Sequence, residues 1–98
     1  MFDKMKAFMD MQKKMQELKR ELENTVFDVV SSDGMVKVVM NGAQEAKEIK
    51  ILKELSDIDK AGLERAIKDA YNKALKRSHD LAGQKMREIT GFNLPGLT

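Results

Sequence analysis

The chain has 98 residues, enough for one domain, and it contains no cysteine, so disulfides, thiolate metal sites and thiol nucleophiles are excluded. Its 18 basic and 16 acidic residues give a formal net charge of +2, and this near balance does not by itself indicate a nucleic-acid ligand. No apolar stretch approaches the roughly 20 residues of a membrane-spanning helix, and the N-terminus lacks the apolar core of a secretion signal, so we expect a soluble, cytoplasmic protein.

Residues 2–24 are predicted to form an amphipathic helix. Apolar side chains recur there at alternating spacings of three and four, which places them on one stripe of the helix. The other positions are mostly Lys, Glu, Gln and Arg, which favour helices, and neither proline nor glycine interrupts the run. The stripe consists of Phe8, Met11, Met15, Leu18 and Leu22.

Two segments after this helix have the character of β-strands. The first, Val26 to Val30, is rich in β-branched and aromatic residues, and the turn-forming residues 31–34 follow it. The second covers residues 35–40 and alternates between two faces. One face carries Val36, Val38 and Met40.

A third strand is expected within residues 43–51, joined to the second by a tight hairpin. The pair Asn41-Gly42 predicts a type I′ turn, in which both central residues have positive φ. Three strands joined by short turns predict an antiparallel meander.

A second, longer helix is predicted to follow the connection formed by residues 52–58. Asp57 or Asp59 is expected to cap its N-terminus, and Gly91 to end it. This helix would hold roughly 30 residues and be about 45 Å long, with Gly83 as a point where it could bend. We therefore expect one domain over residues 1–91 and a short C-terminal tail over residues 92–98.

This order of elements predicts an α+β fold, α-β-β-β-α, with a three-stranded antiparallel meander and two long helices. A small sheet cannot cover two helices of this length, so a monomer would expose apolar stripes beyond the sheet. We therefore expect a homodimer, in which the first helix's stripe and the apolar face of the second strand form the core or the dimer interface. The pairing surface stays open between strand edge, helix stripe or both.

Catalysis and metal binding have little support in the sequence. Ser78-His79-Asp80 contains the residue types of a catalytic triad, but successive helix residues point about 100° apart and cannot line up. One histidine without cysteine does not make a metal site, and no glycine-rich phosphate loop is present. We expect no catalytic residues, no metal, no cofactor and no small-molecule substrate.

Basic residues of both helices are candidates for phosphate contacts. In the second helix Lys73, Lys76 and Arg77 lie at spacings of three and four, with Arg65, Lys68 and Arg87 flanking them more loosely. One such patch is more often a solvated face, but a dimer doubles the number of phosphate contacts. Nothing resembles a recognition helix, so sequence readout should be modest. The full set of candidates for binding duplex DNA is Lys13, Lys14, Lys19, Arg20, Lys73, Lys76 and Arg77.

The first helix is also rich in methionine, which allows one favoured interpretation and two alternatives to it. Methionine fills irregular gaps, so an adaptable core or dimer interface is the favoured interpretation. The alternatives are a helical protein-interaction module and a basic amphipathic helix lying on an anionic membrane. The aspartates Asp3 and Asp10, interspersed among the lysines, weaken the membrane interpretation.

Three stretches together resemble the YbaB/EbfC family and cover nearly the whole chain. They are residues 11–25, residues 35–42 with the strand Ile49 to Ile51, and residues 72–91 with the Leu94-Pro95-Gly96 tail. One departure is that residues 52–57 contain no proline, whereas the family often has an Asp-Pro loop there.

The resemblance implies an α-β-β-β-α domain that forms a tight homodimer with projecting helices. It also implies a nucleoid-associated protein that binds DNA through its helical regions and affects nucleoid organisation and gene expression. The matching positions are the lysines and arginines named above.

Overall fold

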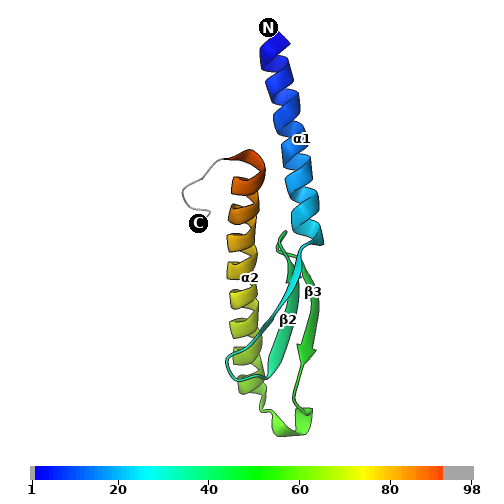
Figure 1. Ribbon diagram of the computed structural model, residues 1–98. Helices are drawn as coiled ribbons and strands as arrows, with labels where there is room; N and C mark the ends of the chain where they lie inside the picture. The colour runs from blue at the N-terminus through cyan, green and yellow to red at the C-terminus, as the bar shows by residue number, and fades with distance from the viewer. Residues whose placement is uncertain (1, 92–98) are drawn as a thin grey trace.

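The computed structural model describes residues 2–91, and the predicted tail over residues 92–98 lies outside this range. Two helices flank three strands, with one short 3₁₀ turn in the last connection (Figure 1). In chain order the elements are α1 (Phe2–Asn24), β1 (Val26–Val30), β2 (Val36–Asn41), β3 (Ala46–Ile51), η1 (Leu55–Asp57) and α2 (Lys60–Thr90). The predicted α-β-β-β-α order is confirmed.

The strands form one antiparallel sheet in the order β1-β2-β3, as the predicted meander requires. Val38 of β2 lies opposite Val29 of β1 and Ile49 of β3. The register shifts between Val39 and Met40, where a bulge interrupts the pairing with β3. The second strand is shifted by one residue from the predicted range, to Val36–Asn41, and the third is shorter than the predicted run, since it begins at Ala46.

The predicted type I′ turn at Asn41-Gly42 is wrong. In residues 2–91 the only non-glycine residue with positive φ is Gln44 (φ 65°), and neither Asn41 nor Gly42 has positive φ. The chain instead closes a wider loop, in which the Asn41 N–H donates to the Glu45 carbonyl at 3.0 Å. Gly42 turns its N–H toward the end of α1, where the carbonyl oxygens of Leu22 (2.9 Å) and Thr25 (3.0 Å) accept it.

Gly42 is required by close approach rather than by its φ. A Cβ at this position would lie 2.8 Å from Leu22 Cδ2 and 3.1 Å from the Leu22 carbonyl oxygen. The contact between the β2–β3 loop and α1 is therefore what selects glycine, and it overrides the local preference of an Asn-Gly pair.

One face of the sheet packs on α2. The helix presents Ala66, Ala70 and Ala74, each at most 2% exposed, and their small side chains let its backbone approach the strands. The opposing side chains of the sheet are Phe27, Val36, Val38 and Met40, and the last three are completely buried.

The ends of α2 follow local capping rules. Asp59 is the N-cap, and its carboxylate accepts the N–H of Gly62 at 3.3 Å. Of the two predicted caps this is the second, because Asp57 belongs to η1. Gly91 ends the helix in the left-handed conformation at φ 75°, as expected. The helix runs through Gly83 without interruption.

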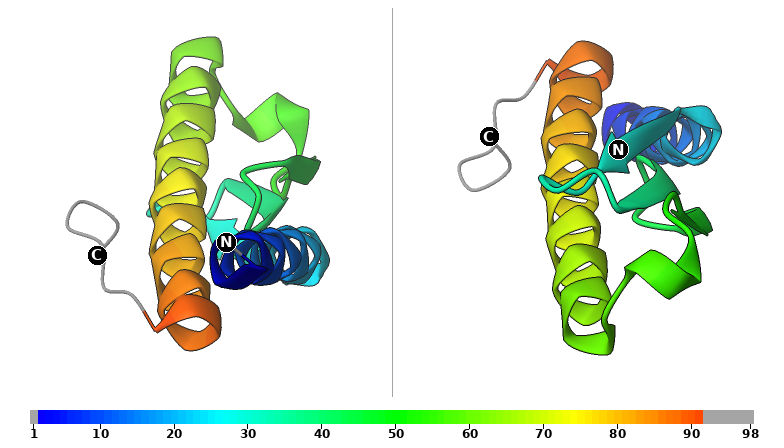
Figure 2. Two further views of the ribbon diagram at one scale, coloured as in Figure 1. Left: turned by 90° about the horizontal axis from the view of Figure 1, so that it is seen from above. Right: turned by 90° about the horizontal axis from the view of Figure 1, so that it is seen from below.

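α1 leaves the sheet beside the C-terminal half of α2 and then projects beyond it (Figures 1 and 2). Leu18 is buried, and an ion pair joins Glu21 to Lys85 of α2 at 3.7 Å. The molecule is consequently elongated, with extents of 67 × 22 × 16 Å.

Candidate nucleic-acid interface

The surface of α2 carries a basic hollow beside the β1–β2 turn. It lies between long side chains on successive helical turns and has a volume of about 440 Å³. The lining residues are Arg65, Lys68, Asp69, Asn72, Lys73 and Lys76. We call this surface the α2 hollow. Four of its six residues are cations, so it is suited to an anionic ligand.

Lys73 is engaged within the molecule. Its ammonium lies 3.2 Å from the Asp69 carboxylate and donates to the Ser32 hydroxyl in the β1–β2 turn. The backbone N–H of Ser32 also donates to Asp69, at 2.8 Å. These two donors, first the Ser32 N–H and then Lys73, hold the pKa of Asp69 below its ordinary value. This cluster attaches the turn to α2 and neutralises the one acidic side chain of the α2 hollow.

Arg77 is also engaged, on the side of α2 that faces β1. Its guanidinium lies 5.1 Å from the centre of the Phe27 ring, which is within cation–π distance. Lys76 lines the α2 hollow instead. The three residues grouped by the sequence thus lie close together on α2 and have different surroundings.

The four candidate cations of α1 are all exposed. Lys19 lies 4.0 Å from Glu23 in a solvated pair of the kind that contributes little stability. Lys13 borders an apolar groove that also contains Met5 and Met9. None of the four lines the α2 hollow, so the cations form one set on each helix.

The apolar stripe of α1 divides into a covered and an uncovered part. Leu18 is 6% exposed and Leu22 is half-buried, because both lie against the body of the molecule. Phe8, Met11 and Met15 are 64%, 39% and 37% exposed. The last three form a groove of about 420 Å³ together with Gln12 and Gln16.

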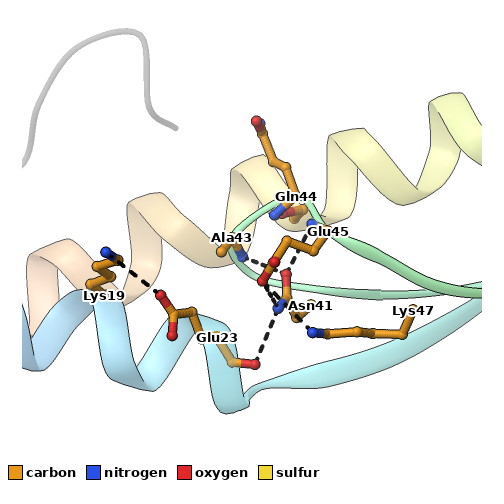
Figure 3. Close-up of polar contacts among 8 residues, drawn as sticks. Lys19, Glu23, Asn41, Ala43, Gln44, Glu45 and Lys47 are labelled. Atoms are coloured by element: carbon orange, nitrogen blue, oxygen red, sulfur yellow. Dashed lines mark hydrogen bonds and ion pairs between the residues drawn. The ribbon is translucent and has the colours of Figure 1, made fainter.

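A polar network joins α1, the β2–β3 loop and β2 around a completely buried asparagine (Figure 3). The Asn41 amide donates to the Glu23 carbonyl at 3.1 Å and to the Glu45 carboxylate at 2.7 Å. Its oxygen accepts the N–H groups of Ala43 and Glu45, both at 3.0 Å. The donated amide hydrogen bond is the main reason that the pKa of Glu45 is lowered. The network thus ties the C-terminal end of α1 to β2 and to the β2–β3 loop.

Sequence reasoning missed this network and underrated part of the α2 hollow. Arg65 and Lys68 were expected only to flank the basic patch, and Asn72 was not considered. Their spacing of three and four, continued to Lys76, would have placed all four on one side of the helix. Within residues 2–91 no group of acidic, histidine or cysteine side chains is arranged to hold a metal ion. Over the same residues, no helix combines the length and apolar character of a membrane span.

The fold resembles that of an uncharacterized protein from Helicobacter pylori, whose crystal structure superposes with a TM-score of 0.68. The two share 23% sequence identity, and the match covers 88% of this chain and 99% of that one. At this identity the likeness shows the fold alone.

Sequence relatives are closer. A protein of Ruminiclostridium cellulolyticum named as nucleoid-associated is 38% identical over 96 residues, covering 95% of this chain and 84% of that protein. A nucleoid-associated protein of Dictyoglomus turgidum is 35% identical over 96 residues, covering 96% and 92% of the two chains. The sequence model of the YbaB/EbfC DNA-binding family matches residues 1–93. With an exposed basic hollow on one helix, further cations on the other and this match over nearly its whole length, the chain belongs to the YbaB/EbfC DNA-binding family.

Proposed function

We propose that this protein is a nucleoid-associated protein that binds duplex DNA as a homodimer, mainly through backbone phosphates and with weak sequence preference. In the nucleoid such binding would affect DNA organisation and gene expression. The observation that carries the proposal is the presence of exposed cations on both long helices of a chain from a DNA-binding family. Phosphate contacts do not depend on base sequence, and a surface of lysines and arginines without a recognition helix favours them.

The elongated shape supports a dimer. The radius of gyration is 18.1 Å, whereas a compact domain of about 100 residues has a value of about 13 Å. The chain exposes 7108 Å² of accessible surface, and a folded monomer of 11.1 kDa is expected to expose about 5,700 Å². The excess is larger than the roughly 800 Å² that one partner buries in a typical interface.

Two apolar surfaces are suited to the pairing of two copies. One is the uncovered stripe of α1, formed by Phe8, Met11 and Met15. The other lies around the edge strand β3, where Ile49, Ile51, Leu52 and Leu55 are between 42% and 67% exposed. Patches of this kind on a small protein indicate an interface.

The test of DNA binding is a mobility shift on duplex DNA between 50 and 300 mM salt, with light scattering to give the mass of the free protein. Phosphate binding predicts an affinity that falls steeply and linearly on a log–log plot against salt. A monomer at micromolar concentration, or an affinity that does not respond to salt, would contradict the proposal.

A second candidate function is a helical protein-interaction module, favoured by the apolar groove on α1. An amphipathic helix of another protein fits such a groove through apolar contacts at helical spacing. The two functions are separated by a pull-down with and without nuclease. Recovery of a specific protein that persists after nuclease treatment, with no affinity for DNA, would favour the second function.

A further inference from the structure

We propose that the DNA backbone is contacted on α2 by Arg65, Lys68 and Lys76, with Asn72 between them, and that Lys73 takes no part. This inference rests on the proposed function and names the residues of one contact surface. The four residues line the α2 hollow together with the Asp69–Lys73 pair.

The geometry of the row fits a polyphosphate. Arg65, Lys68, Asn72 and Lys76 follow one another at spacings of three, four and four, so they lie on one side of α2. At 1.5 Å per residue the row is on the order of 16 Å long. Phosphates of one DNA strand are spaced by about 3.4 Å along the duplex axis, so a row of this length passes several of them.

The charges of the row are available to a ligand. Among residues 2–91, Arg65, Lys68 and Lys76 have no ion pair within 4.0 Å. Asp69 would otherwise repel a phosphate from the middle of the hollow, but its carboxylate is occupied by the Ser32 N–H and by Lys73.

Asn72 adds a donor that carries no charge. Its side chain lies between Lys68 and Lys76 along the row and is exposed. Amide N–H groups are common ligands of phosphate oxygens, where they fix register without reading sequence. The row therefore combines three charges with one neutral hydrogen-bond donor.

Lys73 and Lys76 both line the α2 hollow, but they differ in their contacts within the molecule. The Lys73 ammonium already contacts Asp69 and Ser32, so a phosphate would have to break two contacts to recruit it. Lys76 has no such partner among residues 2–91. Because the two positions are only three residues apart, they form a matched pair for a test.

The test measures the binding of the full-length protein to a 30-base-pair duplex by fluorescence anisotropy, from 50 to 300 mM KCl. Each phosphate contact contributes about 0.9 to the slope of log affinity against log salt. We expect Lys76→Gln to reduce the slope by about 0.9 for each copy in contact with the duplex. The double variant Asp69→Asn/Lys73→Gln removes the ion pair without leaving an unpaired carboxylate in the hollow, and it should leave the slope unchanged. The triple variant Arg65→Gln/Lys68→Gln/Lys76→Gln should reduce it by about 2.7 per copy.

A control variant removes the same charge elsewhere. Lys47, Lys50 and Lys53 lie on and just after β3, and Lys47 and Lys50 pair with glutamates there. The triple variant of these lysines to glutamine should change the slope by less than one contact, about 0.9. Circular dichroism and light scattering show that each variant keeps its helices and its mass.

The outcomes separate this inference from the proposed function. Equal reductions of the salt slope by Asp69→Asn/Lys73→Gln and by Lys76→Gln would overturn the assignment while DNA binding stands. Equal reductions by the α2 triple and the β3 triple would do the same. A wild-type protein without salt-dependent affinity for the duplex would overturn both. Asn72→Asp places a carboxylate inside the row. A tenfold or greater loss of affinity in this variant would further support the assignment of the α2 row.

Discussion

Replacing Asn41 by aspartate tests whether the buried network determines how α1 is attached. The substitution keeps the size of the side chain and keeps the oxygen that accepts the N–H groups of Ala43 and Glu45. It exchanges the amide nitrogen for a second oxygen. That oxygen would then face the Glu23 carbonyl and the Glu45 carboxylate, which are now 3.1 and 2.7 Å from the nitrogen.

The magnitude follows from the two donated hydrogen bonds. A neutral hydrogen bond contributes about 1 kcal/mol and one to a charged group about 1.5–3 kcal/mol, and the new oxygen adds repulsion in a completely buried position. We expect Asn41→Asp to lower the free energy of unfolding by about 3–5 kcal/mol at pH 7. Small domains have a total of about 5–15 kcal/mol, so the variant should be close to unfolding.

The assay is urea denaturation followed by circular dichroism at one fixed protein concentration, because association contributes to apparent stability. Burial and the neighbouring Glu45 carboxylate would raise the pKa of the new carboxyl above its ordinary value of about 4. The carboxyl therefore regains a proton that it can donate, and the cost should shrink, as the pH falls toward 4. Adding Glu45→Gln should recover part of the loss at pH 7, since a side-chain amide can donate to the new carboxylate. A single variant within 1 kcal/mol of the wild type would refute this role of Asn41.

Three further outcomes are expected. Gly42→Ala forces a Cβ against Leu22 at 2.8 Å and should cost about 1–3 kcal/mol in urea denaturation; an unchanged midpoint would mean that the contact relaxes freely. Met40→Ala empties a completely buried site and should cost about 2–5 kcal/mol by the same measurement, whereas a loss below 1 kcal/mol would contradict the packing described. The lowered pKa of Asp69 predicts stability that is complete above the unfolded-state pKa and is lost as pH falls through the folded-state pKa. Acid titration from pH 5 to pH 2 should therefore be less steep in Asp69→Asn, and identical curves would exclude a contribution from the Ser32 contact.

The order of elements could be predicted because each one is encoded locally. The stripe of α1, the alternation of β2 and the caps at Asp59 and Gly91 depend on residues within a few positions of one another. The β2–β3 turn could not be predicted in this way. Its form is decided by contacts of Asn41 and Gly42 with the end of α1, which lies about 20 residues earlier in the chain.

For the candidate interface, too, local sequence predicts one part, and contacts between distant segments decide the other. The positions of the basic residues on α1 and α2 follow from helical periodicity. Which of them are engaged within the molecule depends on tertiary contacts that periodicity does not contain. Asp69 meets Ser32 across 37 residues of sequence, and Arg77 meets the ring of Phe27 on another element. These contacts make Lys73 and Lys76 chemically different although they look equivalent in the sequence.

The part of α1 that projects beyond the rest of the molecule should be the least stable part of the helix in solution. Upstream of Leu18 the helix is held mainly by its own backbone hydrogen bonds, and isolated helices of about 15 residues are marginal in water. Amide protons in these first turns should therefore exchange with solvent quickly in a dilute, dissociated sample and slowly once a second copy covers the stripe. Fraying of this end would then report the degree of association directly, residue by residue.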